Sequence, residues 1–243
     1  MSLIHKHHHS IKHTANFSLI LQIITAIIDF YVLWLPTSEH FLVLKQLLLL
    51  EFIVQIVEGS FYVWLAFAFH TIDNITPYRY YDWYITTPTM LISFSIYLIY
   101  LTTLKESENK NKKENKNEKM TKKDNFFTLV KQNSTVLTII IVLNLIMLTF
   151  GLLNEYHVLN KYVAVFLGFI PFTIMFYLIY ENYAKYTDMG TTLFIYFSSI
   201  WAIYGIAALF PYHLKNIFYN ILDLFSKNFF GLYLAYVLAT SIN

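Results

Sequence analysis

The sequence predicts an all-α protein, a seven-transmembrane-helix bundle, from its composition and from the lengths of its apolar segments. Apolar residues make up 57% of the chain, charged residues only 13%, and the mean hydropathy is +0.50. These values depart from those of soluble domains in the direction of a multispanning membrane protein. Segments long enough to cross a bilayer, about 20 residues each, recur at residues 15–35, 41–69, 77–104, 130–153, 158–180, 191–211 and 214–242.

The first apolar segment, 15–35, is longer than the apolar core of a secretory signal, and no small-residue cleavage pattern follows it. We therefore expect it to remain as a span. An odd number of spans places the two termini on opposite sides of the membrane.

Nine of the seventeen basic residues fall in or just after the connection between the third and fourth segments. They are Lys105, Lys110, Lys112, Lys113, Lys116, Lys119, Lys122, Lys123 and Lys131. Connections rich in lysine stay on the cytoplasmic side. This rule predicts an integral membrane protein with an extracellular N-terminus and a cytoplasmic C-terminus.

The long connection, residues 105–125, is rich in Lys, Asn and Glu and contains no aromatic residue, which predicts a disordered cytoplasmic loop. Attraction to anionic lipid headgroups, about 1 kcal/mol per nearby lysine, is the alternative role, and acidic residues in the loop oppose it. Residues 1–14 are predicted to form a mobile extracellular tail, although the histidines between His5 and His13 could bind a divalent metal or respond to pH. The other connections are short, so residues 1–243 are expected to form a single membrane domain.

Several function classes find no support in the residues. Cysteine is absent, which excludes disulfides, thiolate metal sites and cysteine nucleophiles. The sequence has no Gly-rich phosphate loop, no Ser–His–Asp arrangement and no basic nucleic-acid surface. We therefore expect neither ordinary enzymatic turnover nor nucleic-acid binding, and no metal site is predicted.

A lysine in the last apolar segment, Lys227, is unusual because no charged residue follows it. An ammonium group in mid-membrane costs roughly 2.5 to 3.5 kcal/mol, so such residues usually have a partner or a function. Asp223 lies one helical turn earlier on the same face. A buried lysine also loses its proton readily, which suits it to condense with an aldehyde.

The third apolar segment carries a polar stripe along one helical face. At 100° per residue the stripe consists of Arg79, Asp82, Thr86 and Ser93. Such a face is costly in lipid and is expected to point into the bundle. Arg79 and Asp82 alone could equally form a structural ion pair. Pro88 in mid-span is compatible with a membrane helix.

The first two segments carry a second polar line. Glu51, Gln55, Glu58 and Tyr62 share one face of the second segment, and Gln22, Thr25 and Asp29 share one face of the first. These residues could hold helices together by hydrogen bonds. They could equally line a water-filled cation pathway, because glutamates recur in cation-conducting pores.

Two motifs together resemble the microbial (type 1) rhodopsins. They are Arg79-Tyr80-x-Asp82-Trp83-x-x-Thr86-Thr87-Pro88 in the third segment and Asp223-x-x-x-Lys227 in the seventh. The resemblance covers all seven spans by count and topology, and it is strongest in the third and seventh. It implies a seven-helix bundle of the microbial rhodopsin type around a retinal cofactor. The triplet Asp82, Thr86, Ser93 fits a viral or eukaryotic-algal-type member.

The resemblance also implies roles for the charged residues. Lys227 would hold retinal as a protonated Schiff base, and Asp82 and Asp223 would be its counterions. A charge pair about 4 Å apart gains roughly 4 kcal/mol at an effective dielectric constant of ~20, which shows why carboxylates are needed there. Arg79 would keep both carboxylates ionised, and Thr86 would donate a hydrogen bond to Asp82.

The same resemblance implies a retinal pocket. Its residues would be Trp83, Thr87, Met90, Asn144, Met147, Gly151, Trp201 and Tyr204, with Asn144 reaching Thr87 and Tyr204 bonded to Asp223. Tyr62 is a further candidate partner of Asp223. For Met90 and Met147, ordinary packing is the competing interpretation.

Departures from the family pattern bear on the mechanism. Proton-pumping relatives commonly carry an acidic proton donor where this chain has Ser93, and a serine hydroxyl cannot store a proton near neutral pH. Reprotonation is then expected to come slowly from cytoplasmic water. Residues 210–216, between the last two spans, contain Lys215 and no carboxylate, so early proton release to the outside is not expected.

The function expected from these residues is light-driven outward proton transport, with Asp82 as proton acceptor. A light-gated cation channel is the alternative, supported by Glu51, Glu58 and the missing donor. A sensory photoreceptor is a weaker alternative, because the chain has no appended transducer. The partners expected are membrane lipid and protons or other small cations, and copies of the chain could also associate with one another.

Overall fold

The computed structural model describes residues 2–69, 71–114 and 125–242, and their helices form a seven-span bundle. The first six spans are built on α1 (Ser2–Trp34), α2 (Leu42–Ala68), α3 (Thr76–Glu114), α5 (Ser134–Glu155), α6 (Lys161–Ile179) with the π-turn η2 (Tyr180–Ala184), and α7 (Asp188–Ala207). The seventh span consists of α8 (Tyr212–Asp223), the π-turn η3 (Leu224–Asn228) and α9 (Phe229–Ile242). Two short helices, η1 (Glu39–Phe41) and α4 (Phe126–Gln132), precede α2 and α5. The predicted all-α seven-helix fold is confirmed.

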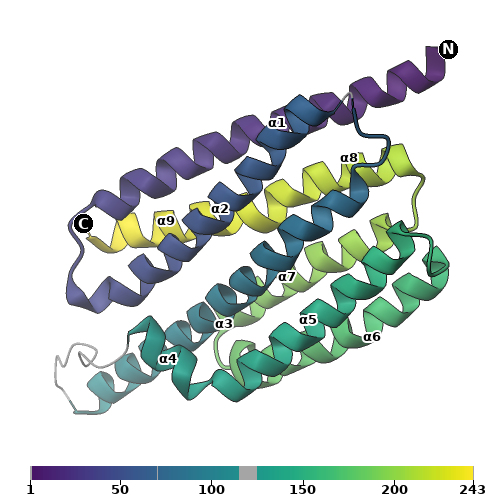
Figure 1. Ribbon diagram of the computed structural model, residues 1–243. Coiled ribbons are helices and arrows are strands. Elements are labelled where there is room, and N and C mark those ends of the chain that lie inside the picture. The colour runs from purple at the N-terminus through teal and green to yellow at the C-terminus, as the bar shows by residue number, and fades with distance from the viewer. Residues whose placement is uncertain (1, 70, 115–124, 243) are drawn as a thin grey trace.

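The helices pack side by side, mostly against their sequence neighbours (Figure 1). The pairs α1–α2, α2–α3 and α5–α6 contact each other extensively, and α1 also packs against α8 and α9, which closes the ring. The two ends of the chain lie at opposite ends of the bundle (Figure 1). This arrangement surrounds the seventh span, and therefore Lys227, with other helices.

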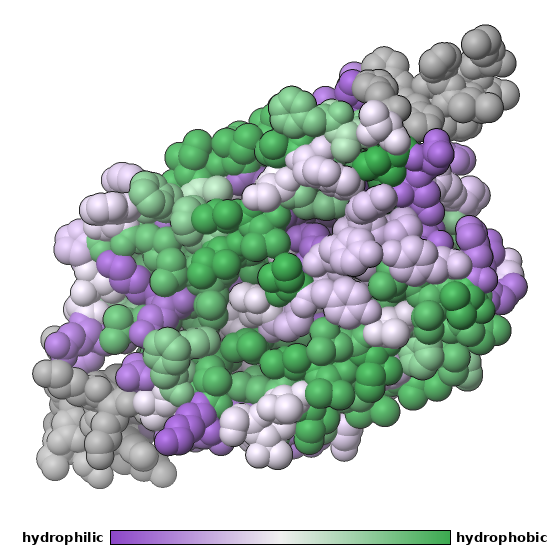
Figure 2. All heavy atoms as spheres, in the orientation of Figure 1, coloured by the Kyte–Doolittle hydropathy of each residue, from purple (hydrophilic) through white to green (hydrophobic). Residues whose placement is uncertain are grey.

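The outer surface of the bundle is apolar, and many polar and charged side chains are buried in the interior beside an apolar core. Phe67 is 83% exposed and Trp34 is 74% exposed, whereas Glu51, Glu58 and Asp29 are fully buried. Figure 2 shows apolar residues spread over the side of the bundle, with hydrophilic residues gathered mainly toward its two ends. Apolar side chains on the outside and buried charges on the inside are what a hydrocarbon environment requires, and the chain is an integral membrane protein.

Two segments expected to lie outside the helices are helical instead. Residues 2–14, expected to form a mobile tail, belong to α1, and residues 105–114, expected to start a disordered loop, extend α3 to Glu114. Neither stretch contains Gly or Pro, so an existing helix can propagate through it without new nucleation. Residues 115–124 of the expected loop and the side chains of His5 to His9 lie outside the described part of the chain.

The fourth span begins later than expected, because the helix is interrupted at Asn133. Asn125 caps α4 by accepting a hydrogen bond from the Thr128 N–H at 2.9 Å, and the Asn133 side chain bonds the Leu129 carbonyl at 2.9 Å. Asparagine side chains compete with the helical backbone in this way and favour helix ends. The sixth span also differs, since α7 runs from Asp188 to Ala207 rather than over 191–211.

The seventh span contains a π-turn at the lysine. The Phe229 N–H bonds the Leu224 carbonyl five residues earlier, so η3 is wider than the α-helical turns on either side. Single π-turns inside α-helices occur frequently at functional sites. Here the π-turn contains Lys227 and Ser226, both buried.

Candidate functional site

The amine of Lys227 lies among three carboxylates from three different spans. Its Nζ is 2.9 Å from Asp82 Oδ2 on α3, 3.2 Å from Glu58 Oε1 on α2 and 3.6 Å from Asp223 Oδ1 on α8. Lys227 is 2% exposed, so water screens these charges little. The expected pairs with Asp82 and Asp223 are present. Glu58, expected from the sequence either to bond neighbouring helices or to line a cation pathway, is a third carboxylate beside the amine.

Asp223 is held by more groups than Asp82. Its Oδ2 accepts a hydrogen bond from the Tyr62 hydroxyl at 2.7 Å, and its Oδ1 accepts one from the Tyr204 hydroxyl at 2.6 Å. Arg79 Nη1 lies 3.5 Å from Asp223 Oδ2. The expected bonds from Tyr62 and Tyr204 are thus confirmed, and each oxygen of Asp223 accepts a tyrosine hydroxyl.

Arg79 pairs with Asp223 and with two asparagines of α8 rather than with Asp82. Its Nε donates to Asn216 Oδ1 at 3.1 Å, and its Nη2 donates to Asn220 Oδ1. Within the described residues Arg79 has no ion pair to Asp82, so the structural Arg79–Asp82 pair that the sequence allowed is not formed. The guanidinium is instead enclosed by the rings of Phe61 and Tyr62, at 5.6 and 5.7 Å.

The first helix closes the bundle beyond Arg79. Asn220 Nδ2 donates to Thr14 Oγ1 at 2.8 Å, and Ser18 Oγ donates to the Asn220 carbonyl at 2.7 Å. The N-terminal part of α1, expected to be a tail, is thereby bonded to the seventh span. These contacts separate the carboxylates from the end of the bundle that carries the N-terminus.

The prediction that Thr86 donates a hydrogen bond to the Asp82 side chain is wrong. Thr86 Oγ1 donates to the backbone carbonyl of Asp82 at 3.0 Å. A threonine inside a helix readily bonds the carbonyl four residues earlier. Asp82 Oδ1 has no hydrogen-bond partner within the described residues, so Lys227 is the group that directly contacts the Asp82 carboxylate.

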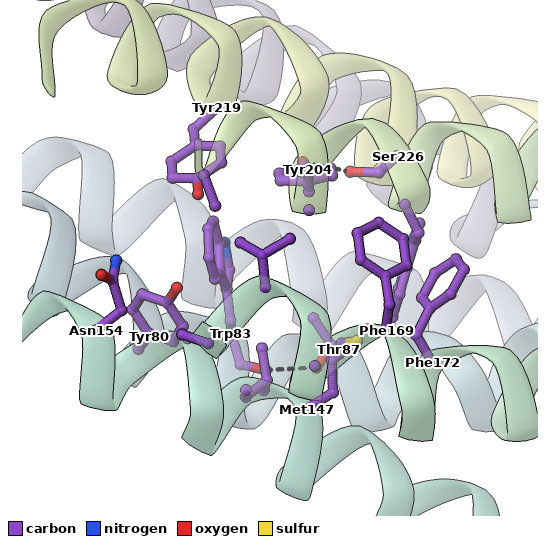
Figure 3. A pocket seen from close by; sticks show the side chains of 18 of the residues that line it. Tyr80, Trp83, Thr87, Met147, Asn154, Phe169, Phe172, Tyr204, Tyr219 and Ser226 are labelled. Carbon is purple, nitrogen blue, oxygen red and sulfur yellow. Dashed lines mark hydrogen bonds between the residues drawn. The ribbon is translucent and has the colours of Figure 1, made fainter. Parts of the chain in front are cut away.

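A cavity of about 120 Å³ adjoins the lysine and is lined mainly by apolar and aromatic side chains. Trp83 and Tyr204 lie on one part of its wall, and Phe169 and Phe172 of α6 lie on another (Figure 3). The residues predicted for a pocket that do line it are Trp83, Thr87, Met90, Met147, Gly151, Trp201, Tyr204 and Lys227. Asn144 lies behind this wall and donates from Nδ2 to Thr87 Oγ1 at 2.7 Å, as expected.

Small residues keep the cavity open. A Cβ added to Gly151 would collide with the Tyr80 ring, and one added to Gly205 would lie 2.8 Å from Phe169 Cζ. Contacts this close do not occur in real structures, so a larger residue at either position would have to displace the ring of Tyr80 or Phe169. Phe169 and Phe172 were not predicted from the sequence, because aromatic residues at helical spacing usually indicate ordinary packing.

A second buried polar cluster lies on the other side of the lysine from Arg79. Ser93 Oγ donates to Glu51 Oε1, and Asp29 of α1 is the neighbouring carboxyl group. All three residues are 0% exposed. Sequence reasoning identified the three residues separately but did not predict that Ser93 and Glu51 form a pair.

A buried ion pair was missed by sequence reasoning altogether. Lys215 Nζ of α8 lies 2.6 Å from Glu155 Oε1 at the end of α5. Glu155 belongs to another span. The lack of a carboxylate in residues 210–216 therefore did not reveal that Lys215 has an acidic partner. The sequence offered no signal for this pair beyond the presence of both charges near segment ends.

The chain is similar to known proteins over nearly its whole length. Residues 13–241 match a family model described as bacteriorhodopsin-like protein. Among solved structures, the viral rhodopsin OLPVRII is 26% identical, with a TM-score of 0.76 over 95% of this chain and 98% of that one. The proton pumping rhodopsin AR2 from the marine alga Acetabularia acetabulum is 16% identical, with a TM-score of 0.67 over 96% of both chains. The rhodopsin of Exiguobacterium sibiricum is 16% identical, with a TM-score of 0.72 over 97% and 98%. A search of curated protein sequences gave no match.

Proposed function

Because the chain belongs to the bacteriorhodopsin-like family of microbial rhodopsins, we propose that it holds retinal on Lys227 and moves protons outward across a membrane in light. The activity is ion translocation rather than enzymatic turnover. The observation that carries the proposal is the 2.9 Å contact between Lys227 Nζ and Asp82 Oδ2 beside an apolar cavity. A proton bound at that nitrogen has a carboxylate acceptor within direct reach.

The residues around the cavity suit retinal. The cavity offers an apolar, aromatic lining for a polyene and the amine of Lys227 for a covalent Schiff-base linkage to its aldehyde. When bound, retinal supplies light absorption and a change of shape that alters the position and the proton affinity of the linked nitrogen. Trp83, Trp201 and the phenylalanines of α6 would hold the polyene and restrict its movement.

Asp82 rather than Asp223 is the acceptor of the proton from Lys227 Nζ. Both oxygens of Asp223 already accept tyrosine hydroxyl bonds, and Arg79 also pairs with Asp223 Oδ2. Asp82 Oδ1 has no such support among the described residues. Proton transfer to Asp82 also moves the proton toward Arg79 and the end of the bundle that we assign to the outside.

Glu58 balances the charge of the site by carrying a proton at rest. Lys227 and Arg79 supply two positive charges, whereas Glu58, Asp82 and Asp223 would supply three negative ones if all were ionised. An uncompensated charge in a fully buried site is unfavourable. Glu58 has one polar contact among the described residues, the 3.2 Å pair with Lys227, which Asp82 shares at 2.9 Å, so Glu58 is the carboxyl group least favoured as an anion.

Orientation and assembly form part of the proposal. The lysine-rich connection after α3 would face the cytoplasm by the positive-inside rule, which places the N-terminus outside and the C-terminus inside. Copies of the chain would associate through the apolar outer surface within the lipid bilayer.

A light-gated cation channel is the second candidate function. It is favoured by the buried line of α1 and α2, where Gln22, Asp29 and Gln55 have side-chain atoms without hydrogen-bond partners among the described residues. Such atoms would bind water, and a hydrated acidic line could admit cations. The sensory alternative has no comparable observation in its favour.

Voltage-clamped cells that express the chain separate the two candidates. For the pump we expect outward light-induced current at every voltage, including against the proton gradient. A current that reverses at a potential tracking a cation gradient would establish the channel instead. Absence of any visible absorption band after addition of retinal would reject both.

The variant Gly205→Val is expected to reduce retinal binding strongly. The valine Cβ would lie 2.8 Å from Phe169 Cζ, so the ring must move into the cavity or the helices must separate. The measurement is the visible absorbance formed per mole of folded protein on titration with retinal. Gly59→Ala is the matched control, because a Cβ there meets nothing closer than Gln22 Oε1 at 3.9 Å. Equal binding by both variants would contradict the assignment of this cavity.

A further inference from the structure

The cavity beside Lys227 extends to the end of the bundle that carries the N-terminus. Asn154 lies in the last turn of α5, Ala164 in the first turn of α6 and Ala208 directly after α7, and all three line the cavity. Figure 3 shows Asn154 beside Tyr80 on one side of the cavity. A cavity that reaches the ends of three helices must be closed there, because water entering it would reach the Lys227 nitrogen.

A buried ion pair bridges the helices at this end. Lys215 Nζ lies 2.6 Å from Glu155 Oε1, and the two side chains are only 9% and 4% exposed. Asn154 Nδ2 donates to the same oxygen of Glu155 at 3.3 Å. The helices α5 and α8 make little backbone contact in the described part of the chain, so these side chains span the distance between them. The ion pair therefore ties the cavity wall at Asn154 to the first turn of the seventh span.

A second lysine fastens the neighbouring helices at the same end. Lys161 Nζ, from the first residue of α6, donates to the Leu209 carbonyl just beyond α7 at 3.1 Å. Leu209 directly follows Ala208, which lines the cavity. A lysine that bonds the last carbonyl groups of a helix also interacts favourably with the helix dipole. The two lysines thus tie α5 to α8 and α6 to α7 around the end of the cavity.

The stretch of α8 that carries Lys215 also positions Arg79. Asn216 follows Lys215 directly and accepts a hydrogen bond from Arg79 Nε at 3.1 Å. Tyr219, one turn after Lys215, lines the cavity, and its ring centroid lies 5.9 Å from Arg79 Cζ. A displacement of Lys215 would therefore move the cavity wall and the partners of Arg79 together.

We propose that the ion pair between Glu155 and Lys215 is a latch that closes the cavity at the end of the bundle that carries the N-terminus. The closed latch keeps water and small nucleophiles out of the cavity, so exchange between the Lys227 nitrogen and that side passes by Arg79. Two buried charges are stable only as a pair, and removal of one leaves the other to draw water into the opening. The latch does not depend on the proposed pumping function, because it controls access to the cavity with or without retinal.

The first test measures the access of water to the cavity in retinal-free protein in lipid nanodiscs. The chain contains no cysteine, so Ala208→Cys introduces a single thiol at the end of the cavity. The probe is a trimethylammonium methanethiosulfonate, whose charge keeps it out of the lipid. Labelling should be slow with the latch intact and about tenfold faster or more when Glu155→Gln is added, because the open form becomes more populated. Equal labelling rates would overturn the proposal.

The matched control is Lys185→Met, which removes an exposed ion pair with Glu181 near the start of α7, away from the latch. Labelling of the Ala208→Cys thiol should be unchanged in this variant. If Glu155→Gln folds poorly, Glu155→Asp keeps the charge while shortening the reach to Lys215, and it should accelerate labelling by a smaller factor. Acceleration by Lys185→Met as large as that by Glu155→Gln would overturn the latch.

Charge reversal and a second thiol separate a latch from general stabilisation. Glu155→Lys and Lys215→Glu should each accelerate labelling, and the double variant, which restores an ion pair, should slow it again. Ser95→Cys places a thiol at a fully buried position of α3, and its labelling should stay slow in Glu155→Gln. Equal acceleration at Ser95→Cys and Ala208→Cys, or no slowing in the double variant, would overturn the latch.

The second test uses the retinal-loaded protein in the dark. Hydroxylamine, a small water-soluble nucleophile that releases retinal from a lysine, should bleach the visible band faster in Glu155→Gln than in the wild type or in Lys185→Met. Equal bleaching rates would overturn the claim that the latch protects the Lys227 nitrogen. If the chain binds no retinal or carries no outward current, the proposed function is wrong, and the thiol labelling still decides whether the latch exists.

Discussion

Lys227→Ala is expected to abolish the visible absorption band and light-induced current completely. The variant removes the amine that would bind retinal, and no other lysine lines the cavity in the described residues. It also leaves the Asp82 carboxylate without its cation, and removal of one partner from a buried ion pair typically costs about 3 to 5 kcal/mol. The measurements are the absorption spectrum after addition of retinal and the thermal midpoint of unfolding.

A second lysine variant keeps the prediction testable if Lys227→Ala folds poorly. Lys227→Arg retains a cation for the carboxylates but has no primary amine, so we expect a folded, colourless protein. Lys45→Ala is the control, because Lys45 Nζ bonds only the Leu35 carbonyl at 3.1 Å among the contacts described and lies away from the cavity. A visible retinal band in folded Lys227→Arg would show that the attachment site is elsewhere.

Asp82→Asn is expected to stop proton transport while leaving retinal bound. Asparagine preserves the shape of the side chain but cannot accept the proton from Lys227 Nζ. A unit charge about 3 Å away contributes roughly 5 kcal/mol at an effective dielectric constant of ~20, so its loss strongly destabilises the positive charge on the nitrogen. We expect the absorption maximum to shift to the red, because the lost carboxylate stabilised the ground state more than the excited state.

The control for this variant is Asp73→Asn, which changes an exposed aspartate in the connection before α3. It should leave both spectrum and current unchanged. Undiminished outward current in Asp82→Asn would mean that another group accepts the proton. The carboxylates of Glu58 and Asp223 would then be the remaining acceptors within 4 Å of the amine.

Features that depend on a single helix, or on a motif shared with the family, could be predicted from the sequence. The seven spans follow from the lengths of apolar segments, and Asp223 and Lys227 face the same way because they lie one turn apart. The contacts Lys227–Asp82, Tyr204–Asp223 and Asn144–Thr87 join different helices, and they were expected because of the resemblance rather than from periodicity.

Features that depend on how one helix is rotated against another were not predicted. Glu58 and Glu51 lie on one face of α2, but periodicity within α2 does not determine which residues of α3 and the seventh span that face meets. The structure places Glu58 against Lys227 and Glu51 against Ser93. Glu155–Lys215 was missed for the same reason, because 60 residues separate its partners.

The π-turn η3 also sets the rotation of everything that follows it in the chain. A π-turn is equivalent to one residue inserted into an α-helix, and one residue corresponds to about 100° of rotation. Gly231 follows this turn and faces Asp29, where an added Cβ would lie 2.8 Å from Oδ2. Deletion of one residue within η3 would restore a regular helix, turn Gly231 away and bring a bulkier neighbour against the buried carboxyl group. The packing of the seventh span against α1 therefore depends on the number of residues in this turn as well as on their identity.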